Sequence, residues 1–296
     1  MTDCLYCGKP IDSRDRRGRK PLFCPGSRCR VGHHRREYRY KEALSKCNDK
    51  PDLAGVLVLE LFPGAGLFGK AFEALGATVV RGPDVLWGGD VRDFRGVTGK
   101  FDGVIGGPPC QAFSRAAISG SSAVNLIPEF LRIVEECKPT WAVMENVREA
   151  ADYAPRWDYV FLRDWNCGGL THRWRGFWFY GIAAPPAPGH RPGTPEYSVL
   201  ASNWSRRGTN RIHGHLHLTP DQAARLQGYP DLAQKIIEHQ PGWKKDNGEW
   251  SGVSQASRAC LATHMIGNGV PAAMGRYIAE YVAVMRFQPK LWSEVG

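Results

Sequence analysis

Residues 56–66 read VLVLELFPGAG, and this stretch decides the fold class. Its first part, VLVLELF (56–62), is a short apolar run of strand length, and the glycines of PGAG end it. The following LFGKAFEALG (67–76) has the pattern of a helix that Gly76 closes. A strand that runs into a glycine turn and a helix is the usual place for a nucleotide-like cofactor, although this signal is weak by itself.

Strands and helices keep alternating after this turn. Further strands are expected at 77–82, 101–107, 140–146 and 177–183, with helices at 125–138 and 271–285. This alternation predicts an α/β fold on a mostly parallel sheet, whose ligands bind at the carboxyl ends of the strands. From residue 184 to 264 the sequence becomes rich in Pro, Gly, Arg, Asn, Ser and Trp, which predicts a separate small region.

The charge of the chain is concentrated at its beginning. Residues 1–46 hold thirteen Lys and Arg against five Asp and Glu, a net charge of +8 out of +10 for the whole chain. Such a basic segment suits binding to a phosphate backbone. No apolar run approaches the roughly 20 residues of a membrane span, and the first residues lack the apolar core that a signal peptide would have. We therefore expect a cytoplasmic protein whose nine cysteines are thiols or metal ligands rather than disulfides.

Four cysteines of the basic segment have the spacing C-x2-C-x16-C-x4-C; they are Cys4, Cys7, Cys24 and Cys29. Two close pairs joined by a loop are what tetrahedral zinc requires. Four unrelated buried thiols are disfavoured, because this short basic segment has too few apolar residues to form a core without a metal. His33 and His34 remain alternatives to Cys29 as the fourth ligand. The segment resembles zinc ribbons in general.

A second cysteine signal lies in GGPPCQAFS (106–114), where two prolines place Cys110 on a stiff loop beyond a strand. An isolated cysteine is more often a buried structural thiol. Here Glu145 ends another expected strand, and Arg173 and Arg175 precede a third. A thiol, a carboxyl group and two guanidiniums at neighbouring strand ends would form a nucleophile, an acid and an anion-stabilising pair.

In their order along residues 56–286, the motifs resemble those of the DNA cytosine-5 methyltransferase family. The matching motifs are E-L-F-P-G-A-G (60–66), G-D-V (89–91), G-P-P-C-Q (107–111), E-N-V (145–147), R-W-R (173–175), R-L-Q-G-Y-P-D (225–231) and G-N-G-V (267–270). Any one of them could occur by chance, whereas the full series in the family's order hardly could. The resemblance implies the Rossmann-like fold of S-adenosylmethionine-dependent methyltransferases.

The resemblance also implies which residues hold S-adenosylmethionine: Glu60, Phe62, Gly64, Gly66, Asp90, Asn268 and Val270. Phe62 would lie against the adenine, and Asp90 would bond its amino group. Asp84 is the best candidate for the acidic residue that grips the ribose. Together with the cysteine cluster, this gives S-adenosylmethionine and Zn²⁺ as the expected cofactors.

For the reaction, the resemblance implies that Cys110 adds to carbon-6 of a cytosine flipped out of the DNA stack. Glu145 would contact ring nitrogen 3 and Arg175 the carbonyl oxygen, so that the charge loaded onto the ring is absorbed. Arg173 would support the Cys110 loop, and Ser114 would touch a backbone phosphate. Carbon-5 would then take up the methyl group and lose its proton, which expels the cysteine.

The chain departs from the family in several places. Thr171 stands where the family has a glutamine, and two of the spacings between motifs are short. The variable region is short, at about 184–218, while 232–262 is longer than the family needs. Base-reading candidates are Arg206, Arg207 and Asn210, with an ordinary polar loop as the alternative. His213, His215 and His217 alternate along what we interpret as an edge strand, and a second metal site there is the weaker reading.

The chain is therefore expected to have four parts. These are a zinc-binding basic module (1–46), a catalytic and cofactor-binding domain (54–183), a target-recognition region (184–264), and a segment (265–296) whose helix returns to the catalytic domain.

The predicted activity is that of a monomeric DNA (cytosine-5)-methyltransferase acting on double-stranded DNA, encoded by a bacterium or by a phage in a bacterial host. A cognate restriction endonuclease is left open as a partner. Two alternatives remain, a catalytically impaired DNA-binding protein of the same fold and an RNA cytosine-5 methyltransferase. The intact Cys110, Glu145 and Arg175 disfavour the first, because a pure binder needs none of them together.

Overall fold

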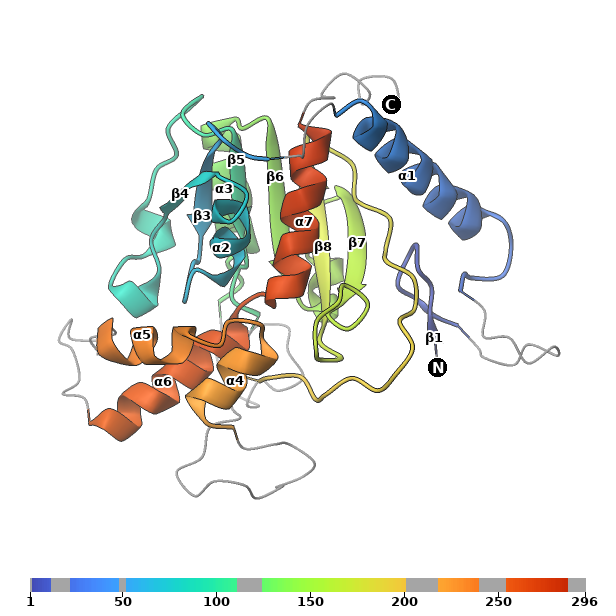
Figure 1. The fold of residues 1–296 in the computed structure, drawn as a ribbon. Helices are drawn as coiled ribbons and strands as arrows, with labels where there is room; N and C mark the ends of the chain where they lie inside the picture. Colours follow the sequence, from blue (N-terminus) through green and yellow to red (C-terminus); the bar gives the residue numbers. More distant parts are fainter. Residues whose placement is uncertain are drawn as a thin grey trace.

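The apolar run of the glycine-turn motif forms β3 (Leu57–Leu61), which lies inside a six-stranded sheet (Figure 1). The computed structural model describes residues 2–11, 22–47, 52–110, 124–200, 218–239 and 254–286. Within these segments the strand order is β4-β3-β5-β6-β8-β7. The other strands are β4 (Thr78–Arg81), β5 (Gly103–Gly106), β6 (Trp141–Asn146), β7 (Asp158–Arg163) and β8 (Trp174–Tyr180).

The sheet is mixed: its first four strands are parallel, β8 is antiparallel to its neighbours β6 and β7, and the edge strand β7 therefore runs in the same direction as the first four. The predicted α/β fold on a mostly parallel sheet is confirmed. Of the two arginines of R-W-R, Arg173 precedes its strand as expected, whereas the same expectation for Arg175 is wrong, because β8 already begins at Trp174. The edge strand β7 was not expected, and its pairing with β8 extends that strand backwards through Arg175.

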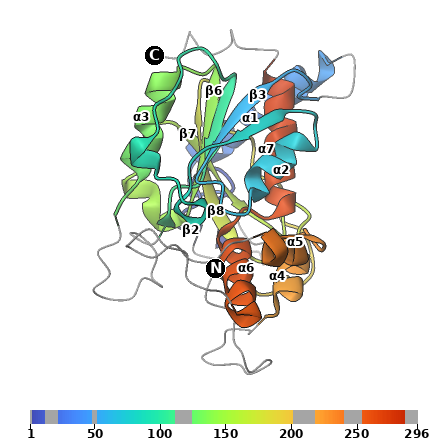
Figure 2. The ribbon, with the colours of Figure 1, turned by 90° about the vertical axis from the view of Figure 1, so that its left-hand side faces the viewer.

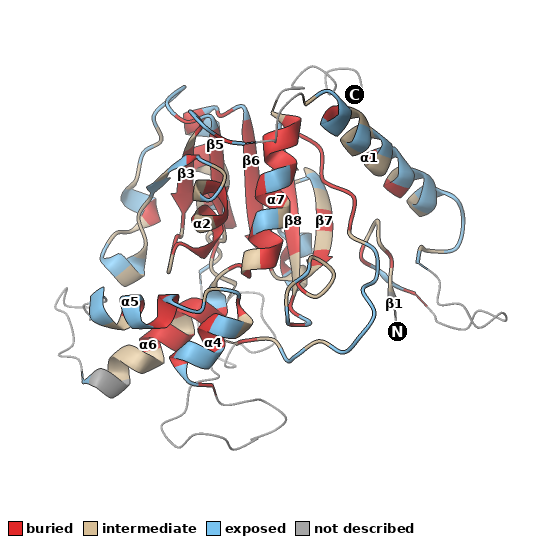
Figure 3. Cartoon of the chain, viewed as in Figure 1, coloured by how far each residue is buried: buried red, intermediate tan, exposed pale blue. Residues whose placement is uncertain are grey.

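Helices cover both faces of the sheet (Figure 2). On one face lies α3 (Ile127–Cys137), whose Phe130 and Ile133 are fully buried in one core cluster. On the other lie α2 (Leu67–Glu73) and α7 (Ala272–Met285). Buried residues follow the central strands and much of α7 (Figure 3). The parallel strands are thus buried from both sides, as such sheets require.

Three further helices form a small unit at one end of the sheet (Figure 1). They are α4 (Pro220–Leu226), α5 (Leu232–His239) and α6 (Gln255–Asn268). A capping box, in which Thr219 and Gln222 bond each other's backbone, starts α4. The unit has its own apolar cluster. Leu67 of α2 is buried in this cluster, so the cluster joins the unit to the helix that follows β3.

The N-terminal segments pack on the same body. A short pair, β1 (Thr2–Asp3) and β2 (Pro10–Ile11), precedes α1 (Arg28–Ser45). The ring of Tyr40 on α1 lies 5.4 Å from that of Tyr281 on α7, and Ala43 is buried in the main core. Across the segments described here, no helix combines the length and apolarity that crossing a bilayer demands.

Candidate active site

A cavity of about 220 Å³ opens at the carboxyl ends of β3, β5 and β6. The turn after β3, the loop after β5, the end of β6 and the last turns of α6 line it. Seven residues singled out from the sequence are in this lining: Phe62, Gly64, Asp84, Cys110, Glu145, Arg175 and Asn268. They meet because the carboxyl ends of parallel strands share one edge of a sheet, where α/β folds bind their ligands.

Cys110 is held on its loop by a side chain from the next strand. The Asn146 Nδ2 atom donates to the Pro108 carbonyl at 3.1 Å, and the Asn146 Oδ1 atom accepts from the Val147 amide at 2.8 Å. Burial raises the pKa of the Cys110 thiol, while the Arg175 guanidinium opposes this rise. Asn146 was quoted as part of E-N-V, but its fixing of the proline loop was not foreseen.

Glu145 and Arg175 face each other across the antiparallel strands β6 and β8. The Arg175 Nε atom lies 2.8 Å from the Glu145 Oε1 atom. Burial raises the pKa of the Glu145 carboxyl group and outweighs the opposing effect of Arg175 and Arg173. A raised pKa makes it easier for a carboxyl group to take up a proton and pass it to a bound base. The lining glycine Gly107 gives it room, since an added Cβ would lie 2.8 Å from the Glu145 Oε2 atom.

Arg173 lies deeper and does not line the cavity. Its Nη1 atom donates to the Val199 carbonyl at 2.6 Å. Burial, followed by the charge of Arg175, lowers the pKa of Arg173 to about 9. In the described part of the chain, its Nε and Nη2 atoms have no hydrogen-bond partner. Its predicted support of the Cys110 loop stays a prediction, because residues 111–123 lie outside the described residues.

The glycine turn after β3 has an unusual backbone. Phe62 and Gly64 both have positive φ, 54° and 52°, and a side chain is rare in this left-handed region. The Gly64 amide donates to the Asp84 Oδ2 atom at 2.8 Å, and the Trp87 indole donates to the Gly64 carbonyl at 2.7 Å. The Leu86 amide bonds the other Asp84 oxygen at 2.8 Å. Asp84 therefore ties the turn to the cavity wall, and Trp87 is a support that sequence reasoning missed.

Four predicted cofactor residues lie outside the cavity lining: Glu60, Gly66, Asp90 and Val270. The Glu60 Oε1 atom accepts from the Gly69 amide of α2 at 2.8 Å, and burial raises the pKa of Glu60 to about 7. The Asp90 carboxylate accepts from the backbone and side chain of Arg92, at 2.9 Å from the amide and 3.0 Å from Nε. Direct contact of these four residues with a cofactor stays a prediction.

Helix α6 adds a histidine to the cavity that the sequence did not point to. The His264 Nε2 atom lies 2.9 Å from the Asn268 Nδ2 atom, one helical turn away. Burial lowers the pKa of His264, which favours the neutral ring at pH 7. The available signal was that His264 stands four positions before Asn268 of G-N-G-V. This spacing places two side chains on the same face only if the segment is a helix.

The four N-terminal cysteines converge. The Sγ atoms of Cys4, Cys7, Cys24 and Cys29 all lie within 4.8 Å of one another, as thiolates around one metal ion would. The Cys7 and Cys24 sulfurs are 3.5 Å apart. Both alternative ligands point elsewhere, since His33 and His34 each pair with Glu37, at 3.4 Å and 3.1 Å. The geometry favours Cys29 as the fourth ligand.

Several predicted DNA contacts cannot be placed in this description. Ser114, Arg206, Arg207 and Asn210 lie outside the described residues, and so do the three histidines at 213, 215 and 217. Their roles stay predictions.

Comparisons with known proteins agree with the motifs. Residues 87–154 match the family model of the C-5 cytosine-specific DNA methylases. Type II methyltransferase M.HgiGI of Herpetosiphon aurantiacus is 47% identical over 49 residues, 16% of this chain and 39% of that relative. Type II methyltransferase M.AluI of Cellulosimicrobium cellulans is 28% identical over 182 residues, 52% of this chain and 33% of that relative. The chain thus spans well under half the length of either relative.

Among solved structures, a substituted form of DNMT2 from Spodoptera frugiperda superposes with a TM-score of 0.41 at 11% identity. The superposition covers 77% of this chain and 99% of that one.

Proposed function

We propose that the chain is a C-5 cytosine-specific DNA methylase, which transfers a methyl group from S-adenosylmethionine to carbon-5 of a cytosine in DNA; the match of residues 87–154 to that family model and the similarity to type II methyltransferases support this. One observation carries the proposal. A single cavity brings a thiol, a carboxyl group and a guanidinium together with an aromatic ring and a glycine turn. The first three groups suit the chemistry on the base, and the last two suit an adenosine cofactor.

The glycine-turn side of the cavity fits S-adenosylmethionine. Gly64 faces open space, since an added Cβ would meet nothing within 4 Å. The Phe62 ring offers a flat apolar surface to the adenine, and the Asp84 carboxylate has acceptor capacity left for a ribose hydroxyl. Asn268 closes the same side from α6. When bound, the cofactor supplies the methyl group that carbon-5 takes up.

On the base side, the Cys110 thiolate adds to carbon-6 of the cytosine and forms a covalent bond. This addition places negative charge on the ring. Glu145 donates its proton toward nitrogen 3, and Arg175 stabilises the charge at the carbonyl oxygen. After carbon-5 is methylated, it gives up its proton to solvent, the electrons of that bond expel the Cys110 sulfur as a thiolate, and nitrogen 3 returns its proton to Glu145.

The target base has to leave the DNA stack to enter this site. Glu145 is almost fully buried, and Cys110 lies beside it in the cavity. A base stacked inside a duplex cannot reach groups at this depth, so the reaction requires base flipping. The unit α4–α6 overlaps the proposed target-recognition region (184–264), and its last helix lines the cavity.

The cysteine cluster supports a second cofactor. We assign one Zn²⁺ to Cys4, Cys7, Cys24 and Cys29, whose sulfurs are close enough to share one ion. The basic module that they organise (1–46), the catalytic domain (54–183) and the C-terminal segment (265–296) complete the proposed division of the chain.

The test uses labelled S-adenosylmethionine with either duplex DNA or tRNA as acceptor. We expect label in DNA at carbon-5 of cytosine, and none after Cys110→Ser. Cys260→Ser is the matched control, because this thiol is half-buried on α6 outside the cavity lining. DNA containing 5-fluorocytosine should trap the native protein covalently. Label in tRNA alone would move the substrate to RNA, and full turnover by Cys110→Ser would overturn the mechanism.

A further inference from the structure

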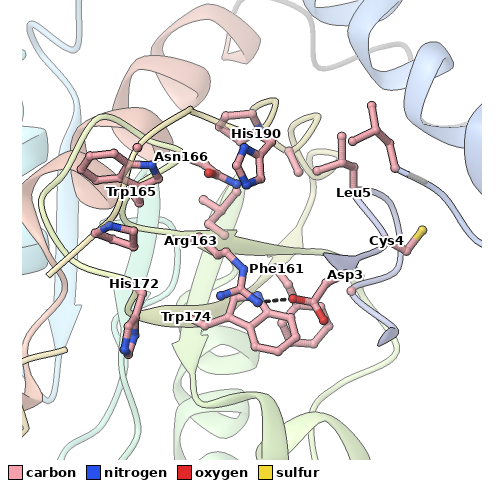
Figure 4. Close-up of a pocket in the computed structure, with 17 residues that line it drawn as sticks. Asp3, Cys4, Leu5, Phe161, Arg163, Trp165, Asn166, His172, Trp174 and His190 are labelled. Carbon is pink, nitrogen blue, oxygen red and sulfur yellow. Dashed lines mark hydrogen bonds and ion pairs between the residues drawn. The ribbon is translucent and has the colours of Figure 1, made fainter. Parts of the chain in front are cut away.

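Both ends of the edge strand β7 are held by the N-terminal residues 2–11 and 22–47, called here the N-terminal module. At the start of β7, Asp158 pairs with Arg36 of α1. At its end, Arg163 pairs with Asp3, as Figure 4 shows. Between them, the Phe161 ring lies so close to Gly8 that an added Cβ would sit 2.4 Å from its Cδ2 atom. The module therefore covers β7 along its length.

At the Asp158 contact, the arginine is buried while the aspartate is partly exposed. Arg36 is 8% exposed, and its guanidinium carbon lies 4.4 Å from the centre of the Tyr6 ring. The Asp158 carboxylate also accepts from the Tyr159 amide at 3.0 Å and the Ala184 amide at 2.9 Å. Removing Asp158 would leave the buried Arg36 guanidinium without this partner, which costs more than breaking a pair between two exposed side chains.

The residues that make these contacts flank the cysteine ligands in the sequence. Asp3, Tyr6 and Gly8 surround the pair Cys4 and Cys7. Arg36 is carried by α1, whose first turn contains Cys29. A metal ion bound by the four thiolates would therefore join the segment that holds the end of β7 to the helix that holds its start. Without the ion, each piece would depend on its own few contacts.

A cavity of about 220 Å³ lies between the module and the β7–β8 hairpin. Leu5, Phe161, Trp174 and His190 are in its lining, and Figure 4 shows them around the Asp3–Arg163 pair. The module and the hairpin therefore do not pack directly against each other across this cavity, and the contacts at the ends of β7 carry more of the attachment.

From the module, the contacts continue to the active site. Arg163 is opposite Trp174 in the β7–β8 ladder, and Leu162 is opposite Arg175. The Trp174 ring has Arg163 and Arg148 guanidinium carbons each 4.8 Å from its centre. Trp174 is thus fixed directly beside Arg175, whose Nε atom meets Glu145 at 2.8 Å.

We propose that the N-terminal module is a metal-dependent clamp on the β7–β8 hairpin that positions Arg175 in the active site. Asp3 and Arg163 are positioning residues in this clamp, and neither touches the substrate. The inference rests on the proposed methyl transfer and on the proposed zinc ion. A basic arm that only adds affinity for DNA makes a different prediction. If the module were such an arm, loss of the metal would weaken DNA binding and leave the rate of the chemical step unchanged.

The first test compares Asp3→Asn with Glu42→Gln. Both remove one negative charge from the module, but Glu42 pairs with Lys46 on the exposed part of α1. Since a misplacement of about 1 Å can cost roughly 100-fold in rate, we expect Asp3→Asn to lower kcat by about 10- to 100-fold. The KM for S-adenosylmethionine should stay unchanged, Asp3→Glu should restore most of kcat, and Glu42→Gln should match the wild type.

The second test does not depend on activity. Stripping the metal with a chelator should speed hydrogen exchange at the amides of β7 and β8, while those of β3 and β5 stay protected. Re-addition of Zn²⁺ should restore the protection. Asp3→Asn should retain the metal and show part of the same increase, which separates the clamp from general unfolding.

Two results would overturn the clamp. One is unchanged exchange of β7 and β8 in the metal-free protein. The other is a raised KM for DNA with unchanged kcat in Asp3→Asn, which would make the module a DNA-binding arm. If the wild-type protein methylates no DNA, the proposed function fails, and the exchange experiment still decides the clamp.

Discussion

The Arg175 guanidinium on β8 and the Glu145 carboxyl group on β6 are in direct contact, with 2.8 Å between Arg175 Nε and Glu145 Oε1, at the edge of the cavity that also holds Cys110. The pair joins the group that stabilises developing charge to the group that donates a proton. It also places a fixed positive charge near the nucleophile, and this charge opposes the effect of burial on the Cys110 thiol. The pH dependence of the reaction should therefore depend on Arg175.

Arg175→Gln should move the pH profile of methylation to higher pH. Burial already raises the pKa of the Cys110 thiol, and Arg175 is the group that lowers it most. The wild-type rate should rise with pH as the thiolate forms, and without the guanidinium the same rise should need a higher pH. The rate of Cys110 alkylation by iodoacetamide, followed by peptide mass spectrometry, measures the thiolate directly. Arg276→Gln, on the exposed side of α7, is the control, and identical profiles for both variants would contradict the prediction.

Asn146→Ala should slow the chemical step without weakening cofactor binding. Its side chain bridges the Pro108 carbonyl and the Val147 amide, and it lies outside the cavity lining. A loosened proline loop would misplace Cys110, and the single-turnover rate should fall by about 10- to 100-fold. Equilibrium dialysis should find an unchanged Kd for S-adenosylmethionine. A weaker Kd with a normal rate would show that the loop serves the cofactor instead.

Glu60→Gln should raise the free energy of unfolding, relative to the wild type, more at pH 8 than at pH 4.5. Burial raises the pKa of Glu60 from its ordinary 4.5 to about 7, so the folded state holds this proton more tightly than the unfolded state. The wild type therefore loses stability as the pH rises from 4.5 through 7. The loss approaches roughly 3 kcal/mol at about 1.36 kcal/mol per pKa unit. Gln cannot ionise and avoids this loss.

Urea unfolding of the cofactor-free protein at both pH values measures this difference. Glu73→Gln should show the opposite trend, because the Arg81 side chain lowers the pKa of Glu73 and its ionised form stabilises the fold. The same pH trend in the Glu60 and Glu73 variants would rule out the assigned cause.

Zinc analysis should find one ion per chain, with loss of the ion in Cys24→Ser. The four sulfurs form a closed set within 4.8 Å, so removing one thiolate leaves an incomplete site. Cys47→Ser is the control, because this thiol lies on the same module and bonds the Ala43 carbonyl at 3.5 Å. Elemental analysis of protein purified without a chelator gives the answer, and zinc retained at full stoichiometry in Cys24→Ser would exclude the cluster as its site.

Much of the active site was predictable because its signals are local. The apolar composition of residues 56–62 and of the segment that ends in E-N-V predicts two strands, and β3 and β6 form there. Once the strands are known, sheet geometry alone brings Cys110 and Glu145 to one edge. The four-cysteine spacing is equally local, since metal coordination needs short loops between paired ligands.

Local patterns in the chain were thus enough to predict the α/β fold, seven of the residues that line the cavity and the cysteine cluster. The edge position of β7 and its contacts with the N-terminal module became visible only in the folded chain. The pairs Arg36–Asp158 and Asp3–Arg163 join residues that are 122 and 160 positions apart in the chain. A sequence with this many Arg and Asp residues offers numerous such pairings of equal chemistry. Packing selects among them, because only the folded chain brings these two pairs of side chains within contact distance.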